Sequence, residues 1–243
     1  MLRSSLIYLS KAAWAQKLIT NWSFASRAAS RFVPGEKNED VIRAIRELNE
    51  SGFNATLNHL GEHLSTADEA EKATAEILLV LNEIDKANLK SNVSIKLTQI
   101  GIGLDERICQ QNLVQILTLV KKCNNFLRVD MEDTPYTDIT ISLYRSMLER
   151  GFDQRQLGLV LQAYLFRTED DLRKLLKEGT RIRLVKGAYD ESADKAYSKK
   201  ADTDANYDLL TKIMIDAALE MEAKSGSEDG RIPPFVAIAS HDE

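Results

Sequence analysis

Five short apolar runs in this chain are interrupted by polar or charged residues near their carboxyl ends. A parallel strand that is buried on both faces should stay almost continuously apolar. The runs are SIKLTQIG (94–101), FLRVDMED (126–133), LGLVLQAYLFR (157–167), IRLVKGAY (182–189) and FVAIASHDE (235–243). The interrupting residues are Lys96, Asp130, Gln162, Arg183 and the pair Ser240 and His241. In a β/α barrel the active site is built from the carboxyl ends of the strands, so this placement predicts a site for chemistry.

Alternation along the strands assigns the charged residues to the inside of a barrel. Lys96, Asp130 and Arg183 each share a face opposite an apolar face, and the apolar faces must meet the helices. A lone charge inside would cost several kcal/mol, but Lys96 and Asp130 lie on neighbouring strands and can neutralise each other. Two interpretations remain open, a structural ion pair or the floor of a polar pocket. Gln162 and Arg183 continue the ring, which favours the pocket.

The segments around these runs alternate between strands and helices, which is the pattern of parallel βα units. Strands are expected at 53–60, 93–98, 126–131, 157–162, 181–186 and 235–240, and helices at 41–49, 65–87, 105–123, 136–150, 168–178 and 204–224. Asp40 is the expected N-cap of the helix over 41–49. Six strands fit either a smaller open sheet or an α/β chain with a (β/α)8-type TIM barrel that is incomplete here. We expect an N-terminal helical arm over 1–48 and a partial barrel over 49–243.

Charge is unevenly distributed along the 243 residues, whose net charge is −5. Residues 1–35 carry five basic and no acidic residues, which leaves 27 basic and 37 acidic residues in the remainder. The basic start is typical of a helical arm or of a membrane-surface contact through Trp14 and Trp22. The acidic body argues against nucleic acid as a partner. Cys109 and Cys123 are expected to be reduced thiols of a cytosolic protein.

Three other patterns suggest chemistry that the spacing does not support. HLGEH (59–63) matches the H-x-x-E-H spacing of some zinc peptidases, but it contains a glycine and lies at a strand exit rather than on a helix. We therefore expect no metal site. The glycines of GIG (101–103) lack the third glycine of a dinucleotide-binding loop. Lys186 or Lys96 as a Schiff-base lysine of a barrel aldolase is a genuine alternative, because a desolvated lysine is a nucleophile.

Taken together, these strings resemble the proline dehydrogenases, flavoenzymes that oxidise L-proline to 1-pyrroline-5-carboxylate. The similarity rests on SIKLTQIG, RVDMED, VLQAYL, RLVKGAY with the trailing AYSKKADTDANYDLL, and the final IASHD, and it extends from about residue 31 to the last residue. The arm before it resembles that of the short bacterial monofunctional form. The resemblance implies a distorted β/α barrel with FAD lying across the strand ends.

The resemblance also implies roles for individual residues. Asp130 and Arg183 match the acidic active-site residue and the arginine near the reactive flavin nitrogen. Lys96 and Tyr189 match residues that contact the substrate. The residues that match cofactor contacts are Met131, Gln162, Lys186, Gly187, Ala188, Ser240 and His241. Where this sequence has Ser240 and His241, the family usually has Thr-His, so Ser240 keeps the hydroxyl and lacks the methyl group of threonine.

One family feature has no counterpart in this sequence. The family's last helix carries adjacent arginines that clamp the proline carboxylate, and no Arg-Arg pair occurs here. We therefore expect a C-terminally truncated chain that exposes apolar surface and is itself poorly active. The resemblance implies a membrane quinone as electron acceptor, and a cytoplasmic location with peripheral contact at the inner face of the membrane. An inactive fragment that acts as a binding module is a further alternative, and a yellow, FAD-loaded preparation would argue against it.

Overall fold

The computed structural model describes residues 35, 38–58, 61, 64–223, 225–240 and 242. The chain divides into two compact units, residues 1–47 and 48–243, and each is described by itself. Residues 1–34 of the arm expected over 1–48, and both histidines of the HLGEH motif, lie outside the described residues. Helix α4 (Asn38–Glu50) begins two residues before Asp40, so the prediction that Asp40 is its N-cap is wrong. The Asp40 carboxylate instead accepts a hydrogen bond from Arg43 at 2.6 Å.

The second unit alternates strands and helices along the chain, as the sequence predicts. Its strands are β1 (Ala55–Asn58), β2 (Ser91–Ile95), β3 (Leu127–Val129), β4 (Leu157–Gln162), β5 (Arg181–Val185) and β6 (Val236–Ile238). Its helices are α5 (Ala67–Lys86), the short 3-10 helix η1 (Leu97–Ile100), α6 (Glu106–Lys122), α7 (Thr134–Glu149), α8 (Thr168–Lys177) and α9 (Lys200–Glu220). Every helix expected between residues 65 and 224 is therefore present, with ends that differ by a few residues.

Local sequence explains where these helices begin and end. Thr66 caps α5 with a capping box, in which Glu69 N donates to the Thr66 hydroxyl and the Glu69 carboxylate accepts from Thr66 N. Asp105 caps α6 by accepting from Arg107 N at 2.6 Å. Gly151, just beyond α7, has a φ of +90°, a left-handed conformation that favours glycine.

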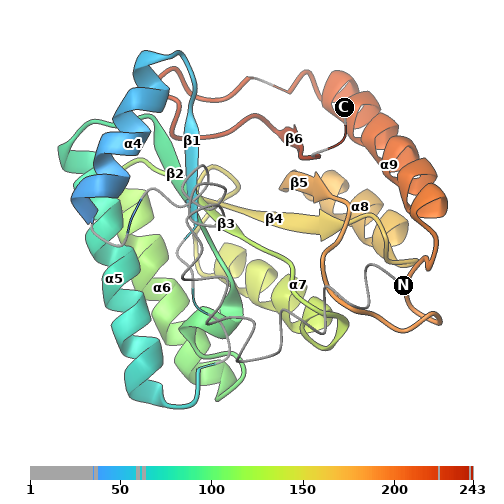
Figure 1. Cartoon of the computed structure of the whole chain (residues 1–243), viewed down its shortest axis with the longest axis horizontal. Helices are drawn as coiled ribbons and strands as arrows, with labels where there is room; N and C mark the ends of the chain where they lie inside the picture. Colours follow the sequence, from blue (N-terminus) through green and yellow to red (C-terminus); the bar gives the residue numbers. More distant parts are fainter. Residues whose placement is uncertain are drawn as a thin grey trace, which may run out of the picture. The chain divides into compact units, whose positions relative to one another are not determined.

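The six strands form one parallel sheet in the order β1-β2-β3-β4-β5-β6. Helices α5 to α9 follow the strands around the outside of the curved sheet (Figure 1). Among the described residues β1 and β6 do not pair with each other, so the sheet is open and forms a partial β/α barrel. Parallel strands direct their carboxyl ends to one edge, and this edge positions the site.

The outward face of the sheet forms the core beneath the helices. Ile95, Leu159, Ile182 and Leu184 are completely buried there. The apolar face that alternation predicts is therefore confirmed. Strand β2 differs from the prediction because it ends at Ile95 and η1 begins at residue 97. Thr98 consequently belongs to η1 and does not continue the inner face of the strand.

Two further observations concern the helices. Cys109 on α6 and Cys123 at its C-cap are buried free thiols. Burial, the largest cause in each case, raises the pKa of both. Of the helices that the structure describes, none has the length and apolar character required to cross a membrane.

Candidate active site

The carboxylate of Asp130 is the meeting point of four strands. Asp130 follows β3, and its Oδ1 accepts from Ser94 Oγ of β2 at 2.7 Å and forms an ion pair with Arg183 of β5. Its Oδ2 accepts from Asn58 Nδ2 of β1 at 3.0 Å. The side chains of Asp130 and Arg183 are only 13% and 21% exposed. A buried ion pair of this kind is tolerated when further hydrogen bonds occupy the remaining polar atoms, and here Asn58 and Ser94 supply them.

The structure thus joins two residues that the sequence placed in one ring, Asp130 and Arg183. The ion pair at Asp130 is formed by Arg183, whereas the sequence suggested Lys96. Because β2 ends one residue before Lys96, this lysine takes the N-cap position of η1. Its positive charge lowers the pKa of Glu132, so Lys96 lies close to that carboxylate.

Glu132 is a buried acid of the site that the sequence analysis did not single out. Its side chain is 1% exposed. Oε1 accepts from Thr98 N at 3.0 Å, and Oε2 accepts from the Thr98 hydroxyl. Burial raises the pKa of Glu132, while the two Thr98 hydrogen bonds and then Lys96 oppose the rise. Alternation offered a signal, because Glu132 follows Asp130 by two residues.

Gln162 is buried at the end of β4, as the ring of polar residues requires. Its side chain is 2% exposed, and Nε2 donates to the Glu132 carbonyl at 2.9 Å. This bond fixes the amide plane relative to the segment that carries Asp130. Met131, between Asp130 and Glu132, is 4% exposed.

Tyr189 lies beside these acids although it comes from the loop after β5. Its pKa is raised by burial first, and then by the negative charges of Glu132, Asp133 and Asp130. The loop approaches Tyr164 so closely that a Cβ at Gly187, where φ is +121°, would lie 2.2 Å from the Tyr164 ring. Gly187 therefore has a packing reason to be glycine. The neighbouring Ala188 is exposed.

The same loop is fastened to α7. Asp133 takes the N-cap position of α7 without a side-chain cap bond. Glu191 from the loop takes over this function, because its carboxylate accepts from Thr134 N at 2.6 Å and from the Thr134 hydroxyl at 2.7 Å. Farther along, Tyr197 packs edge-on against Phe166 with ring centroids 4.7 Å apart. The segment that carries Tyr189 is thus tied down on both sides.

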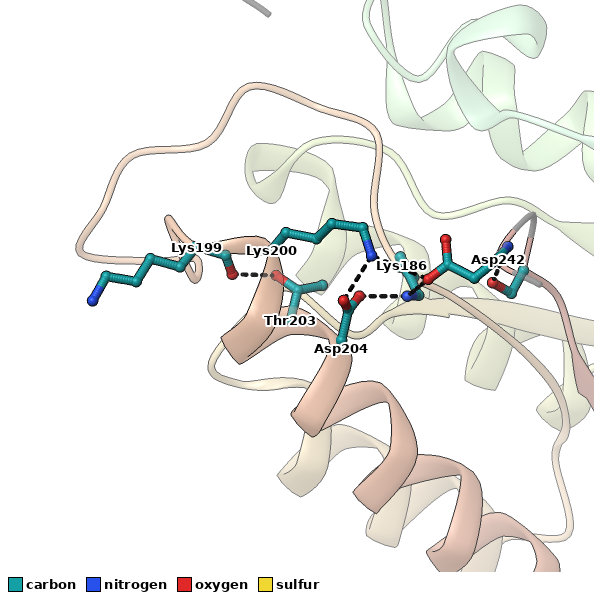
Figure 2. Close-up of polar contacts among 7 residues, drawn as sticks. Lys186, Lys199, Lys200, Thr203, Asp204 and Asp242 are labelled. Carbon is teal, nitrogen blue, oxygen red and sulfur yellow. Dashed lines mark hydrogen bonds and ion pairs between the residues drawn. The ribbon is translucent and has the colours of Figure 1, made fainter.

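Lys186 at the end of β5 belongs to a separate charged quartet with Lys200, Asp204 and Asp242. Lys186 Nζ forms ion pairs with both carboxylates. Lys200 Nζ contacts the same two carboxylates at 2.6 and 3.2 Å (Figure 2). The hydrogen bonds that Lys186 donates to Asp204 and then to Asp242 raise the pKa of Lys186. A lysine held protonated is a poor nucleophile, which argues against Lys186 as a Schiff-base residue.

The last predicted positions follow β6. Ser240 is exposed, and its hydroxyl accepts from Asp242 N at 3.0 Å. His241 lies outside the described residues. Among the described residues no group of three or more His, Cys, Asp or Glu side chains could hold a metal ion. A surface groove of about 480 Å³ lies along α7 and α8, and none of the predicted site residues lines it.

The chain is similar to known proteins in sequence and in fold. The sequence profile of the family described as proline dehydrogenase matches residues 41–243. Proline dehydrogenase 1 of Bacillus subtilis (strain 168) is 33% identical over 246 residues, which cover 100% of this chain and 74% of the relative. The proline dehydrogenase of Deinococcus radiodurans is 33% identical over 218 residues, which cover 88% of this chain and 65% of the relative.

Solved structures show the same fold. Proline utilization A (PutA) from Bdellovibrio bacteriovorus, inactivated by N-propargylglycine, superimposes with a TM-score of 0.74 at 20% identity, over 94% of this chain and 26% of that chain. PutA from Corynebacterium freiburgense superimposes with a TM-score of 0.70 at 24% identity, over 88% of this chain and 24% of that chain. The chain therefore spans about a quarter of each of these PutA proteins.

Proposed function

The chain belongs to the proline dehydrogenase family, and from this premise we propose that it binds FAD and L-proline at the carboxyl edge of its sheet. The proposed reaction is oxidation of L-proline to 1-pyrroline-5-carboxylate. The proposed site lies within residues 49–243. The observation that carries the proposal is the ion pair of Asp130 and Arg183, held by Asn58 and Ser94 at the ends of four strands.

The donors of the site fit a flavin. Arg183 Nε is buried and has no hydrogen-bond partner among the described residues. A buried donor without a partner is costly, and an acceptor atom of a flavin ring would satisfy it. Gln162 offers an amide whose plane is already fixed. Met131, Lys186, Gly187, Ala188, Ser240 and His241 are the further residues that we propose to contact FAD. When bound, FAD supplies the acceptor for the hydride that proline loses, at flavin N5.

The residues of the chain would bind and orient the reactants. Arg183 is a permanent cation that stabilises negative charge developing near it. Asp130 is held in one orientation by its three partners. We propose that Lys96 and Tyr189 contact the substrate, because both lie within electrostatic reach of Glu132. A fixed ring of this kind favours near-attack geometry without reorganisation.

The test is the flavin content and proline response of three proteins. We expect the wild type to purify yellow and its flavin absorbance to bleach slowly with proline in the absence of oxygen, because the carboxylate clamp of the family has no counterpart in this sequence. Arg183→Met should slow this bleaching about 100-fold, as loss of a preorganised charge does. Asp130→Asn should also slow it, because Arg183 then lacks its counter-ion.

The matched control is Arg145→Met, which breaks the exposed ion pair between Arg145 and Glu178. It should leave flavin content and bleaching unchanged. A colourless wild type, or an Arg183→Met protein as active as the wild type, would reject the proposal. Trapping with borohydride and a carbonyl compound would instead indicate a Schiff-base enzyme, and a colourless, untrappable protein would indicate a binding module.

We further propose a membrane quinone as electron acceptor, with peripheral contact at the inner face of the membrane from a cytoplasmic protein. The resemblance to the family and the basic, Trp-containing start of the chain support this proposal. Flotation with vesicles that contain anionic lipid tests it.

A further inference from the structure

A second arginine lies inside the barrel, below the ion pair of Asp130 and Arg183. Arg128 lies on β3 and precedes Asp130, which follows the strand, by two residues, so alternation directs both side chains to the inner face. Its side chain is 2% exposed. Arg128 NH1 donates to the Leu159 carbonyl at 3.3 Å. Within the part of the chain that the structure describes, no carboxylate forms an ion pair with it. Burying a cation in this way costs several kcal/mol, so its position calls for an explanation.

The surrounding residues pack closely against the Arg128 guanidinium. It lies over the ring of Phe126, with 5.0 Å between Arg128 Cζ and the ring centroid. An aromatic face attracts a cation through its quadrupole. Gly158 pairs with Arg128 across β3 and β4, and a Cβ there would lie 2.6 Å from Phe126 Cζ and 2.4 Å from the Arg181 carbonyl oxygen. Glycine at 158 therefore makes room for the ring on which Arg128 rests.

Arg128 is also electrostatically coupled to the ion pair. Burial is the largest cause that lowers its pKa, the positive charge of Arg183 is the next, and the negative charge of Asp130 opposes both. The charges of Arg183 and Asp130 therefore both act on Arg128, while only Arg183 forms an ion pair with Asp130. The inner face beneath the strand ends keeps a positive charge that Asp130 does not neutralise.

We propose that Arg128 is a positioning residue of the site, which supplies this second positive charge from below the ion pair of Asp130 and Arg183. The inference rests on the proposed function. A flavin gains negative charge on reduction, and a fixed cation in a water-excluded interior stabilises that charge at short range. Arg128 acts through Asp130 and Arg183 and needs no contact with the substrate.

The test compares the flavin midpoint potential of the FAD-loaded protein in Arg128→Gln, Arg128→Lys and wild type. We expect Arg128→Gln to shift the potential to more negative values. Its kcat should fall about tenfold, which corresponds to about 1.4 kcal/mol, with KM changed less. Arg128→Lys keeps the charge, although it loses the planar fork, and should restore most of both quantities.

Arg181→Gln is the matched control. Arg181 is also an arginine of the inner face, and its positive charge is the weakest of the influences on the pKa of Arg128. Its side chain donates to the carbonyls of Gln154 and Pro233. Arg181→Gln should lower the melting temperature and shift the potential much less than Arg128→Gln does. If Arg128→Gln does not fold, Phe126→Leu removes the ring beneath the cation and should shift the potential in the same direction by a smaller amount.

The outcomes separate this inference from the proposed function. Flavin-loaded wild type with an unshifted potential in Arg128→Gln, or an equal shift in Arg181→Gln, would overturn the role of Arg128 alone. An unshifted potential in Phe126→Leu would do the same where Arg128→Gln does not fold. A wild type that binds no flavin would overturn both.

Discussion

At the scale of single residues, the site depends on which polar atom each carboxylate contacts. Asp130 and Arg183 could be predicted from alternation, because a charge on the inner face of a buried strand is conspicuous. Asn58 could not be predicted in this way, because β1 is polar on several positions and its register against β2 is set by tertiary pairing. Glu132 was missed because it follows the end of β3, where alternation is a weaker guide.

Glu132 gives a prediction on pH. Burial raises the pKa of Glu132, so the folded state holds its proton more tightly than the unfolded chain does. The free energy of unfolding therefore falls as the pH rises above about 4.5, the ordinary value for this group. Glu132→Gln lacks this titration and keeps an oxygen that accepts from Thr98 N. It should gain stability relative to wild type between pH 4.5 and 7.5, as measured by denaturant unfolding. Exposed Glu149→Gln should show no such trend, and a wild type that gains stability relative to Glu132→Gln would contradict the prediction.

At the scale of elements, the sequence predicts types better than ends. The bounds of β4 agree with the prediction because LGLVLQ is buried at every position and turn residues flank it. The end of β2 does not agree, because LTQI continues an apolar pattern while the backbone turns into η1. Alternation alone cannot distinguish a strand from a short 3-10 turn that is equally buried. The contact of Glu191 with α7 joins residues 57 positions apart, and no local pattern encodes it.

The Glu191 contact predicts a local change in dynamics. Glu191→Ala removes the acceptor for Thr134 N, and loss of a helix cap costs about 1 kcal/mol. Hydrogen exchange in the first turn of α7 and in the loop over 187–199 should accelerate about fivefold, because exchange reports local opening free energy. Asp190→Ala, at the exposed neighbouring position, is the control and should leave exchange unchanged. Equal acceleration in the two variants would show that the loop is not held by Glu191.

At the scale of the whole second unit, the alternation of strands and helices predicts the partial barrel and its sequential strand order. The sequence analysis also predicts that this unit exposes apolar surface. Large apolar side chains on α9, Leu209, Ile215 and Leu219, are 45%, 42% and 71% exposed. Ile238 on β6 is 47% exposed. Which of these side chains are exposed could not be predicted, because α9 is apolar on more than one face.

The β6 edge leads to a prediction on association. An exposed strand edge with an apolar side chain is a template for pairing with another chain. The 243-residue protein should sediment faster as its concentration rises, and Ile238→Lys should weaken this dependence. Leu79→Lys on α5, at a position 48% exposed, is the matched control and should behave as wild type does. If both substitutions weaken the concentration dependence equally, association would be due to nonspecific hydrophobic contacts and not to the edge of β6.

The two buried thiols, Cys109 and Cys123, can report how often the folded chain opens locally. A thiol reagent attacks the thiolate form. Burial disfavours that form at Cys109, and burial together with the negative charge of Asp85 disfavours it at Cys123. In the native protein, the rate of alkylation is therefore limited by the rate at which α6 locally unfolds from the sheet. The alkylation rate could therefore rank the variants described above by their local stability, and the measurement needs no bound flavin.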